Sequence, residues 1–465
     1  MKFLDRTEEL MRLNRLSEAQ EGGFVALWGR RRIGKSELLK RWCGESDGIY
    51  TVADRSTAAV QRMNFAAALS SCFEGFDAVV YPTWKALFDA LSRSASERNW
   101  HRPLIIDEFP YWVEAYESIL SVMQNWIDAE KRRKGMLIAI AGSSLHMMQG
   151  IVINQDSPLY GRADERIKLG PLGFEYVGEA LGLSNPIDRI KAYAIWGGVP
   201  RYWVAAERYR ASLDDAVDEQ ILSPLGIFHD EISTLLHSEI PSAFSLKPYL
   251  DVIGSGVNRM SEIAARTGVA ATTLSKPLSR LVDLGFVKRE IPYGENEKNS
   301  KKSLYKIADQ FCRFWFDIVA PRRSIFENAP ALLRKSIWRK YSSRLFAAEW
   351  EELARRSVVV SKRLASLSGR DDFWMPAGRW WQGAEHELDV VSVNGSRTKT
   401  MIGEVKWSER PFTRKEVTAL VAEFTTRTSP PGLPQNVVRS LFLPAIAPDV
   451  ETFINGVTIV TAFDS

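Results

Sequence analysis

A phosphate-binding pattern near the N-terminus is the feature that most constrains this chain. The segment from Gly29 to Ser36 reads G-R-R-R-I-G-K-S and fits G-x-x-x-x-G-K-[ST] without departure. Its glycines allow a tight turn in which successive backbone N–H groups face phosphate oxygens. Lys35 can reach the β- and γ-phosphates of a nucleotide, and the Ser36 hydroxyl can bind Mg²⁺. We therefore expect ATP and Mg²⁺ as cofactors.

The context of this loop supports the same interpretation. Residues 24–28 before it form a continuous apolar run, which is typical of a strand buried on both faces. A helical pattern starts at Lys35, so the positive end of its dipole points at the same anion. The residues that we expect to bind nucleotide are Gly29, Arg30, Arg31, Arg32, Ile33, Gly34, Lys35, Ser36 and Glu37. The three arginines can contact phosphate or DNA, or simply lie in solvent.

Two further apolar runs end in polar side chains that suit this chemistry. Residues 103–106 lead into Asp107, which we expect to hold Mg²⁺ with Ser36, and into Glu108, which we expect to orient and deprotonate the attacking water. Two solvated carboxylates at a strand end are the alternative. Residues 136–141 lead to Ser143 and Ser144, either of which can sense the γ-phosphate or form a turn or helix N-cap.

Six motifs in the first 205 residues resemble those of the archaeal-type ATPases of the STAND/AAA-like P-loop group. They are FLDRTEEL at 3–10, the phosphate loop, IIDEF at 105–109, AGSS at 141–144, PLYGR at 158–162 and WGGVP at 196–200. The resemblance implies a position for Arg6 beside the nucleotide base. It also implies that Arg162 approaches the γ-phosphate, for which a structural salt bridge is the alternative. Such proteins often carry a C-terminal winged helix and a nuclease-like domain.

The middle of the chain has the pattern of a winged helix, with helices at 261–269 and 271–285 followed by strands at 286–289 and 303–307. Pro277 lies inside the second helix and should bend it or move its start. A protein-packing module is the alternative to DNA contact. The side chains that can meet phosphates or the groove are Lys276, Arg280, Lys298, Lys301, Lys302, Thr272, Thr273 and Ser275.

The C-terminal region places Asp389 before a turn, then Glu404 and Lys406 on the next strand. Strand alternation puts Glu404 and Lys406 on one face, where Glu404 can share a divalent metal with Asp389 while Lys406 positions the water. This pattern resembles the core of the PD-(D/E)xK nucleases, which implies a helical carboxylate, here Glu351. Glu349 and Glu352 are rivals for that role. The segment 378–381, G-R-W-W, has the look of these proteins, and packing is its plain interpretation.

The alternation of strands and helices predicts an α/β fold, with a parallel P-loop NTPase sheet, a helical lid, a winged helix and an α/β nuclease-like domain. The predicted boundaries are 1–170, 171–240, 241–310 and 311–465. The net charge of +4, from 61 basic and 57 acidic residues, does not require a nucleic-acid partner. Three distant cysteines and the lack of an apolar run of about 20 residues suggest a cytoplasmic protein without a membrane partner.

Two functions fit these observations. In the first, ATP hydrolysis moves the helical lid and the winged helix, and so controls a nuclease-like domain that acts on DNA. In the second, the chain is a slow signalling switch with a protein-binding winged helix and an inert C-terminal domain. A homo-oligomer is compatible with both.

Overall fold

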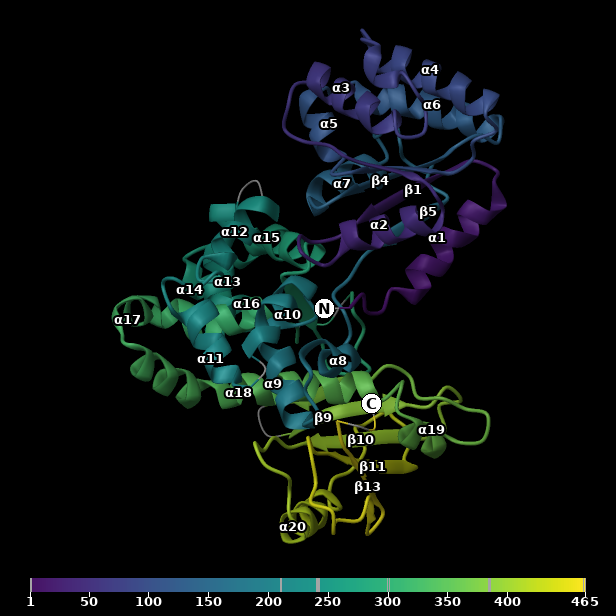
Figure 1. Cartoon of the computed structure of the whole chain (residues 1–465). Helices are drawn as coiled ribbons and strands as arrows, with labels where there is room; N and C mark the ends of the chain where they lie inside the picture. Colours follow the sequence, from purple (N-terminus) through teal and green to yellow (C-terminus); the bar gives the residue numbers. More distant parts are fainter. Residues whose placement is uncertain are drawn as a thin grey trace.

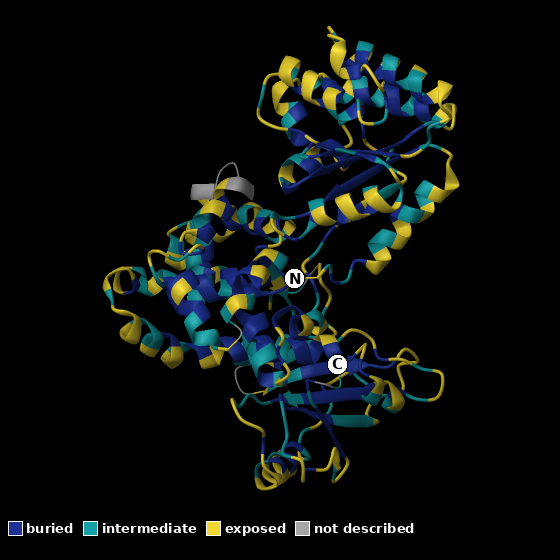
Figure 2. Cartoon of the chain, viewed as in Figure 1, coloured by how far each residue is buried: buried dark blue, intermediate teal, exposed yellow. Residues whose placement is uncertain are grey.

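The computed structural model describes residues 2–209, 211–239, 243–298, 300, 302–383, 386–462 and 464. An N-terminal α/β domain, a central group of helices and a C-terminal α/β domain follow one another from top to bottom of Figure 1. Both sheets are buried, while the outer faces of their covering helices are exposed (Figure 2). This arrangement confirms the predicted α/β class. None of the described helices combines the length and apolar composition that a membrane span requires.

The N-terminal domain is built on a parallel five-stranded sheet in the order β2-β3-β4-β1-β5. The central strand β1 pairs with β4 on one side and with β5 on the other. Every residue of β1, β3 and β4 is buried, which explains why these strands are continuous apolar runs. The five strands are β1 (Gly23–Trp28), β2 (Ile49–Val52), β3 (Pro103–Asp107), β4 (Leu137–Gly142) and β5 (Glu165–Lys168).

Helices cover both faces of this sheet. Alternate strand residues enter two separate cores, so that Val25 and Leu27 pack with Leu38 of α2, whereas Phe24 packs in the core of the opposite face. Helices α1 and α2 lie on one side in Figure 1 and α3 to α6 on the other. The helices are α1 (Thr7–Ala19), α2 (Lys35–Glu45), α3 (Ala58–Leu69), α4 (Trp84–Glu97), α5 (Pro110–Ala115), α6 (Ile119–Arg132) and α7 (Leu145–Val152).

The described residues between 171 and 239 contain helices and turns but no strand, in agreement with the sequence pattern. Trp196 and Trp203 are fully buried among them and join this region to the core of the N-terminal domain. The main helices are α8 (Val177–Leu181), α9 (Pro186–Trp196), α10 (Pro200–Ala206), α11 (Leu213–Val217) and α12 (Glu231–Glu239).

Three helices and an antiparallel hairpin follow. Leu274, Leu278 and Leu281 are fully buried at helical spacing on α15, as their pattern predicts. Helix α15 continues through Pro277, which therefore does not mark its start. The elements are α13 (Ala243–Gly254), α14 (Met260–Thr267), α15 (Ala271–Asp283), β6 (Val287–Glu290) and β7 (Leu304–Ile307).

The C-terminal domain is a mixed six-stranded sheet in the order β12-β13-β11-β10-β9-β8. Strands β8, β9 and β10 are antiparallel neighbours, whereas β10, β11 and β13 run parallel. The long helix α18 joins the central helices to this sheet (Figure 1). The elements are α16 (Gln310–Phe314), α17 (Arg323–Asn328), α18 (Ala331–Ser357), α19 (Lys362–Ser368), β8 (Gly378–Gln382), β9 (His386–Val393), β10 (Thr400–Val405), α20 (Arg414–Phe424), β11 (Val437–Phe442), β12 (Phe453–Ile454) and β13 (Val457–Val460).

Candidate functional site

The phosphate-loop residues form a tight turn between β1 and α2. Gly34 has a φ of 91° at the N-cap of α2, in the left-handed region that favours glycine. Gly29 lies so close to the Leu169 carbonyl that a side chain there would collide with it. The Lys35 ammonium is buried inside the turn and donates to the carbonyl oxygens of Gly29, at 2.8 Å, and Arg30, at 2.9 Å. The loop therefore holds the positive charge of Lys35 in a fixed position.

Asp107 lies at the end of β3 and joins this loop to the neighbouring strand. Its Oδ2 accepts hydrogen bonds from Ser36 Oγ, at 2.6 Å, and from the Tyr50 hydroxyl, at 2.7 Å. Burial and the adjacent Asp107 raise the pKa of Tyr50, so the phenol is a neutral donor. Tyr50 was not among the predicted site residues, and it reaches Asp107 because β2 lies beside β3 in the sheet. The Ser36–Asp107 contact brings together the two predicted oxygen ligands of Mg²⁺.

Glu108 points toward the end of β4. Its Oε2 accepts hydrogen bonds from the Ser143 backbone N–H, at 3.1 Å, and from Ser143 Oγ, at 2.9 Å. Ser144 instead caps α7 by accepting from the Met147 N–H. Glu108 itself has a φ of 53°, which is uncommon for a residue other than glycine. The structure thus separates the two serines that the sequence left as alternatives.

A cavity of about 650 Å³ opens over these residues. Its volume is within the range of ligand pockets in proteins. The N-terminal segment and helix α10 also contribute to its lining. The lining residues are Lys2, Phe3, Leu4, Arg6, Arg31, Arg32, Ile33, Gly34, Lys35, Ser36, Glu37, Glu108, Ser143, Leu172, Pro200, Arg201 and Val204. Most of the predicted nucleotide-binding residues therefore share one cavity.

The two arginines that the resemblance singled out lie in different places. Arg6 lines the cavity, is buried, and donates to the backbone oxygens of Ile33 and Gly170. Arg162 is not among the lining residues, because its guanidinium forms an ion pair with Asp128 at 3.1 Å. In this conformation Arg162 forms the structural salt bridge that was the alternative to a γ-phosphate contact.

The three loop arginines do not simply lie in solvent. Arg30 forms a 2.8 Å ion pair with Asp309 and also covers the ring of Phe286. Arg32 forms an ion pair with the buried Glu231 of α12. Arg31 lies 3.4 Å from the Tyr111 hydroxyl. Two of the three arginines therefore connect the phosphate loop to elements beyond the N-terminal domain.

Three residues of the predicted nuclease site lie on α18, β9 and β10, and the fourth, Lys406, directly follows β10. Asp389 Oδ2 accepts from the Val405 N–H at 2.8 Å, and Lys406 forms a 2.8 Å ion pair with Glu404. Burial, followed by the charges of Glu351 and Glu404, raises the pKa of Asp389 to about 6. The charges of Glu351 and Glu404 thus act on Asp389, and Lys406 pairs with Glu404. Among the described residues, however, no three acidic, histidine or cysteine side chains converge in a way that could hold a metal ion.

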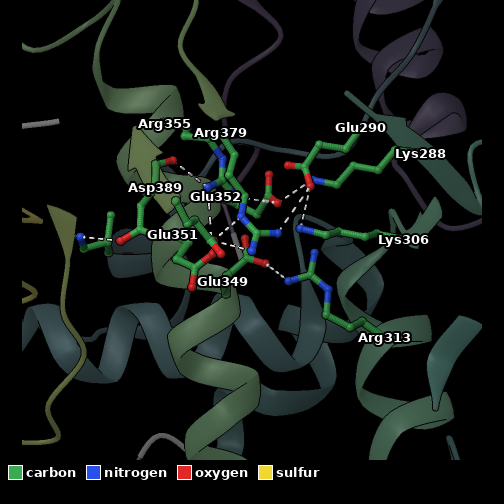
Figure 3. Close-up of polar contacts among 12 residues, drawn as sticks. Lys288, Glu290, Lys306, Arg313, Glu349, Glu351, Glu352, Arg355, Arg379 and Asp389 are labelled. Carbon is green, nitrogen blue, oxygen red and sulfur yellow. Dashed lines mark hydrogen bonds and ion pairs between the residues drawn. The ribbon is translucent and has the colours of Figure 1, made fainter. Parts of the chain in front are cut away.

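A network of buried charges surrounds Asp389 (Figure 3). Arg355 donates to the Asp389 carbonyl oxygen at 3.0 Å and forms a 2.8 Å ion pair with Glu352. Lys288 of the hairpin also pairs with Glu352, at 2.5 Å. Although burial opposes it, these cations lower the pKa of Glu352.

The same network shows which of the three candidate carboxylates of α18 remains available as a metal ligand. Glu349 is fully buried and pairs with Arg313, at 3.0 Å, so it is not available as a ligand. Glu352 is engaged as described above. Glu351 is 36% exposed, and its one ion pair among the described residues is with Arg355, at 3.8 Å. Glu351 is therefore the least engaged of the three candidates.

Most of the residues predicted to contact DNA are exposed to solvent. Thr272, Thr273, Ser275 and Lys276 are exposed on α15. Lys298 is exposed on the hairpin loop, and Lys302 pairs with Glu295 at 2.7 Å. Lys301 lies outside the described residues. Arg280, on the same helix, is partly exposed. One face of α15 is thus open to solvent.

Comparisons with known proteins agree with this geometry. Residues 3–205 match a family described as an ATPase domain predominantly from Archaea. Residues 315–420 match a family of archaeal and bacterial proteins of unknown function. An uncharacterised protein of Methanocaldococcus jannaschii is 27% identical over 409 residues, which are 88% of each chain.

Two solved structures were also compared with the chain. The Walker-type ATPase of Pyrococcus abyssi has a TM-score of 0.52 at 20% identity, covering 68% of this chain and 96% of its own. The ORC2 protein of Aeropyrum pernix, in its ADPNP–ADP complexes, has a TM-score of 0.46 at 14% identity, covering 75% and 95%. The similarity to the Pyrococcus abyssi structure shows that the fold of this chain is of a known type.

Proposed function

Because residues 3–205 belong to the family of P-loop ATPase domains found predominantly in Archaea, we propose that this chain hydrolyses ATP and that the nucleotide state controls its C-terminal half. The observation that carries the proposal is the 2.6 Å contact between Ser36 and Asp107 beside the buried Lys35 ammonium. A hydroxyl and a carboxylate are the oxygen ligands that Mg²⁺ prefers. The residues present therefore fit a magnesium–triphosphate complex.

Three residues that line the cavity have direct roles in this mechanism. Bound Mg²⁺ supplies charge neutralisation for the phosphates. Lys35 exchanges the Gly29 and Arg30 carbonyls for oxygens of the β- and γ-phosphates. Glu108 accepts the proton of the attacking water, and Ser143 holds the Glu108 carboxylate through its two hydrogen bonds.

The loop arginines provide a route from the nucleotide to the rest of the chain. Arg30 and Arg32 form ion pairs with Asp309 and Glu231, which lie outside the N-terminal domain. Phosphate oxygens compete with these carboxylates for the same guanidinium groups. Occupation of the loop therefore weakens the hold of the phosphate loop on α12 and on the start of α16. This exchange couples the nucleotide state to the helical region.

We propose that the C-terminal half acts on DNA. The helices α14 and α15 and the hairpin form a winged helix, whose open α15 face carries Thr272, Thr273, Ser275 and Lys276. In the sheet that follows, Asp389, Glu404 and Lys406, with Glu351, serve as a nuclease centre. The raised pKa of Asp389 supports this assignment, because neighbouring acids of this kind are stabilised by a divalent cation.

A slow switch with an inert C-terminal domain is the second candidate. It is favoured by Lys406, which already neutralises Glu404, and by the lack of a convergent metal-binding group among the described residues. Nuclease assays with Mg²⁺ or Mn²⁺ distinguish the two candidates. Cleavage of DNA that Asp389→Ala and Glu404→Ala both abolish supports the nuclease. Intact DNA under all conditions supports the switch.

The ATPase proposal is tested with Glu108→Gln. We expect ATP turnover to fall by 10²–10⁴-fold, which is about the contribution of a general base, while nucleotide binding by calorimetry is retained. Glu117→Gln is the matched control, because Glu117 is exposed on the same connection and does not line the cavity. Normal turnover in Glu108→Gln would show that another group activates the water.

A further inference from the structure

A second cleft lies between the hairpin and the edge of the C-terminal sheet. Its volume is about 520 Å³, and its walls are formed by the start of α14, the β6–β7 hairpin and the end of β8. We call this space the hairpin cleft. Its lining includes Arg259, Ser261, Arg289, Lys302, Tyr305 and Trp381. Neither the ATP site nor the proposed nuclease centre contains these residues.

The two walls of the hairpin cleft are fixed to each other. The Tyr293 N–H donates to the Arg379 carbonyl oxygen of β8 at 2.8 Å, and the Val393 N–H donates to the Tyr293 hydroxyl at 3.1 Å. Strand β8 is the last strand of its sheet, so the loop of the hairpin covers this edge. The cleft is therefore a built feature between two packed units rather than a gap between mobile ones.

The charge of the hairpin cleft is one-sided. Arg259, Arg289 and Lys302 line it, and no carboxylate is among its described lining residues. Just outside the lining, Lys302 pairs with Glu295 at 2.7 Å and Arg259 lies 4.0 Å from Glu262, which leaves Arg289 as the least compensated of the three cations. The Arg289 guanidinium donates to neutral acceptors alone, which are Ser303 Oγ and the carbonyl oxygens of Glu297 and Ser300. Arg289 is exposed and forms no ion pair with the described residues, and these contacts hold its guanidinium in place. An anionic ligand would replace water at this cation.

Tyr305 adds a hydroxyl to the wall of the cleft. The residue is 7% exposed and lines the cleft. Its hydroxyl is not among the buried, unsatisfied polar atoms of the described residues, so it reaches solvent and can donate to a ligand that enters the cleft. The helices α14 and α15 also begin at this cleft, and neither N-cap, Arg259 or Ala270, supplies a side-chain cap. Free N–H groups of their first turns add to its attraction for anions.

We propose that the hairpin cleft binds the sugar–phosphate backbone of a nucleic-acid single strand. Three cations and several hydroxyl donors match phosphodiester oxygens, and Trp381 offers an aromatic wall against a sugar or base. The cleft is lined by Ala271 at the start of α15 and by the end of β8, which pairs with the strand β9 that carries Asp389. A single strand bound there would lead from the winged helix toward the C-terminal sheet. This inference rests on the proposed action on DNA and names a separate site for it.

Binding of a fluorescently labelled single-stranded 20-nucleotide DNA, followed by anisotropy on the full chain, tests the inference. Arg259→Gln should weaken binding about fivefold at about 0.1 M salt and reduce the salt slope by about 0.7, the value for one lost phosphate contact. Tyr305→Phe should weaken binding about fivefold through loss of one hydrogen bond. The thermal stability of Tyr305→Phe should not fall, because the hydroxyl reaches solvent in the free protein. Arg266→Gln, an exposed arginine of the same helix outside the lining, is the matched control and should bind as the wild type does.

Four outcomes would overturn the inference. Equal effects of Arg259→Gln and Arg266→Gln would indicate diffuse charge attraction rather than a site. Competition by AMP at the same phosphate concentration as the oligonucleotide would assign the cleft to a free nucleotide. Loss of duplex binding in Lys276→Gln, with unchanged single-strand binding in Arg259→Gln and Tyr305→Phe, would leave the winged helix as the DNA site and remove the cleft. Absence of any DNA binding would overturn both this inference and the proposed action on DNA.

Discussion

The ion pair between Arg30 and Asp309 makes the proposed coupling measurable. Both side chains are largely buried, with exposed fractions of 18% and 12%. Although burial opposes it, the Arg30 guanidinium lowers the pKa of Asp309. Asp309 also caps α16 by accepting from the Cys312 N–H at 2.7 Å. Asp309→Asn removes the charge but retains an oxygen for the cap, so the substitution isolates the ion pair.

The expected magnitude follows from this geometry. Two unit charges about 4 Å apart in a protein of effective dielectric constant about 20 interact by about 4 kcal/mol. Partial exposure of Arg30 allows water to recover part of that energy. We therefore expect a coupling energy of about 2–4 kcal/mol between Arg30→Gln and Asp309→Asn in a double-mutant cycle.

Unfolding of the wild type, the two single variants and the double variant measures this coupling. The exposed pair Arg41 and Glu45, at 2.9 Å on α2, is the matched control. Its cycle should give about 0.3–0.5 kcal/mol, the value for a pair one helical turn apart. Calorimetry should also show tighter ATP binding in Asp309→Asn, because Arg30 no longer has to leave a carboxylate.

Strict additivity of the two substitutions would refute the reasoning. A coupling energy no larger than that of the control pair would mean that the ion pair contributes nothing beyond a surface contact. Unchanged ATP affinity in Asp309→Asn would separate the pair from the nucleotide site, even if the pair stabilises the fold.

Three smaller predictions concern pH and capping in the C-terminal domain. The pKa of Asp389 is raised from 3.8 to about 6, so ionised Asp389 destabilises the fold and the free energy of unfolding should fall as pH rises between these values. Asp389→Asn should therefore raise the free energy of unfolding by about 3 kcal/mol at pH 7.5 and by about half as much at pH 5. Thermal unfolding at the two pH values measures the difference. Thr413→Ala should cost about 1 kcal/mol because Thr413 and Glu416 form a capping box at α20. Hydrogen bonds from Arg410 and Thr413 lower the pKa of Glu416 to about 2, so the stabilisation it gives should be present above about pH 4.5 and be lost as pH falls toward 2.

The parallel sheet was predictable because strands buried on both faces must be apolar throughout. The same logic located Asp107 and Glu108, since polar residues follow such a strand at the edge where ligands bind. Tyr50 was not found because its role depends on β2 lying beside β3, which the sequence order does not reveal. The sequence thus showed where the strands lie along the chain, but it did not show which strands are neighbours in the sheet.

The long-range contacts of the loop were beyond sequence analysis for a different reason. Arg30 and Asp309 are 279 residues apart, and no local pattern marks either as a partner of the other. For Arg162, a local motif predicted a contact with the nucleotide. In this conformation the Arg162 guanidinium instead pairs with Asp128. Charge pairing is set by the packing of whole domains, which the sequence pattern alone does not fix.

The left-handed backbone at Glu108 has a consequence for which residues this position tolerates. A side chain with a Cβ costs about 1–2 kcal/mol in that conformation, and glycine or asparagine costs less. Glutamate is therefore a poor choice there for folding. A saturation library at this codon, sorted only for expression and heat resistance, should become rich in glycine and asparagine and lose its glutamate.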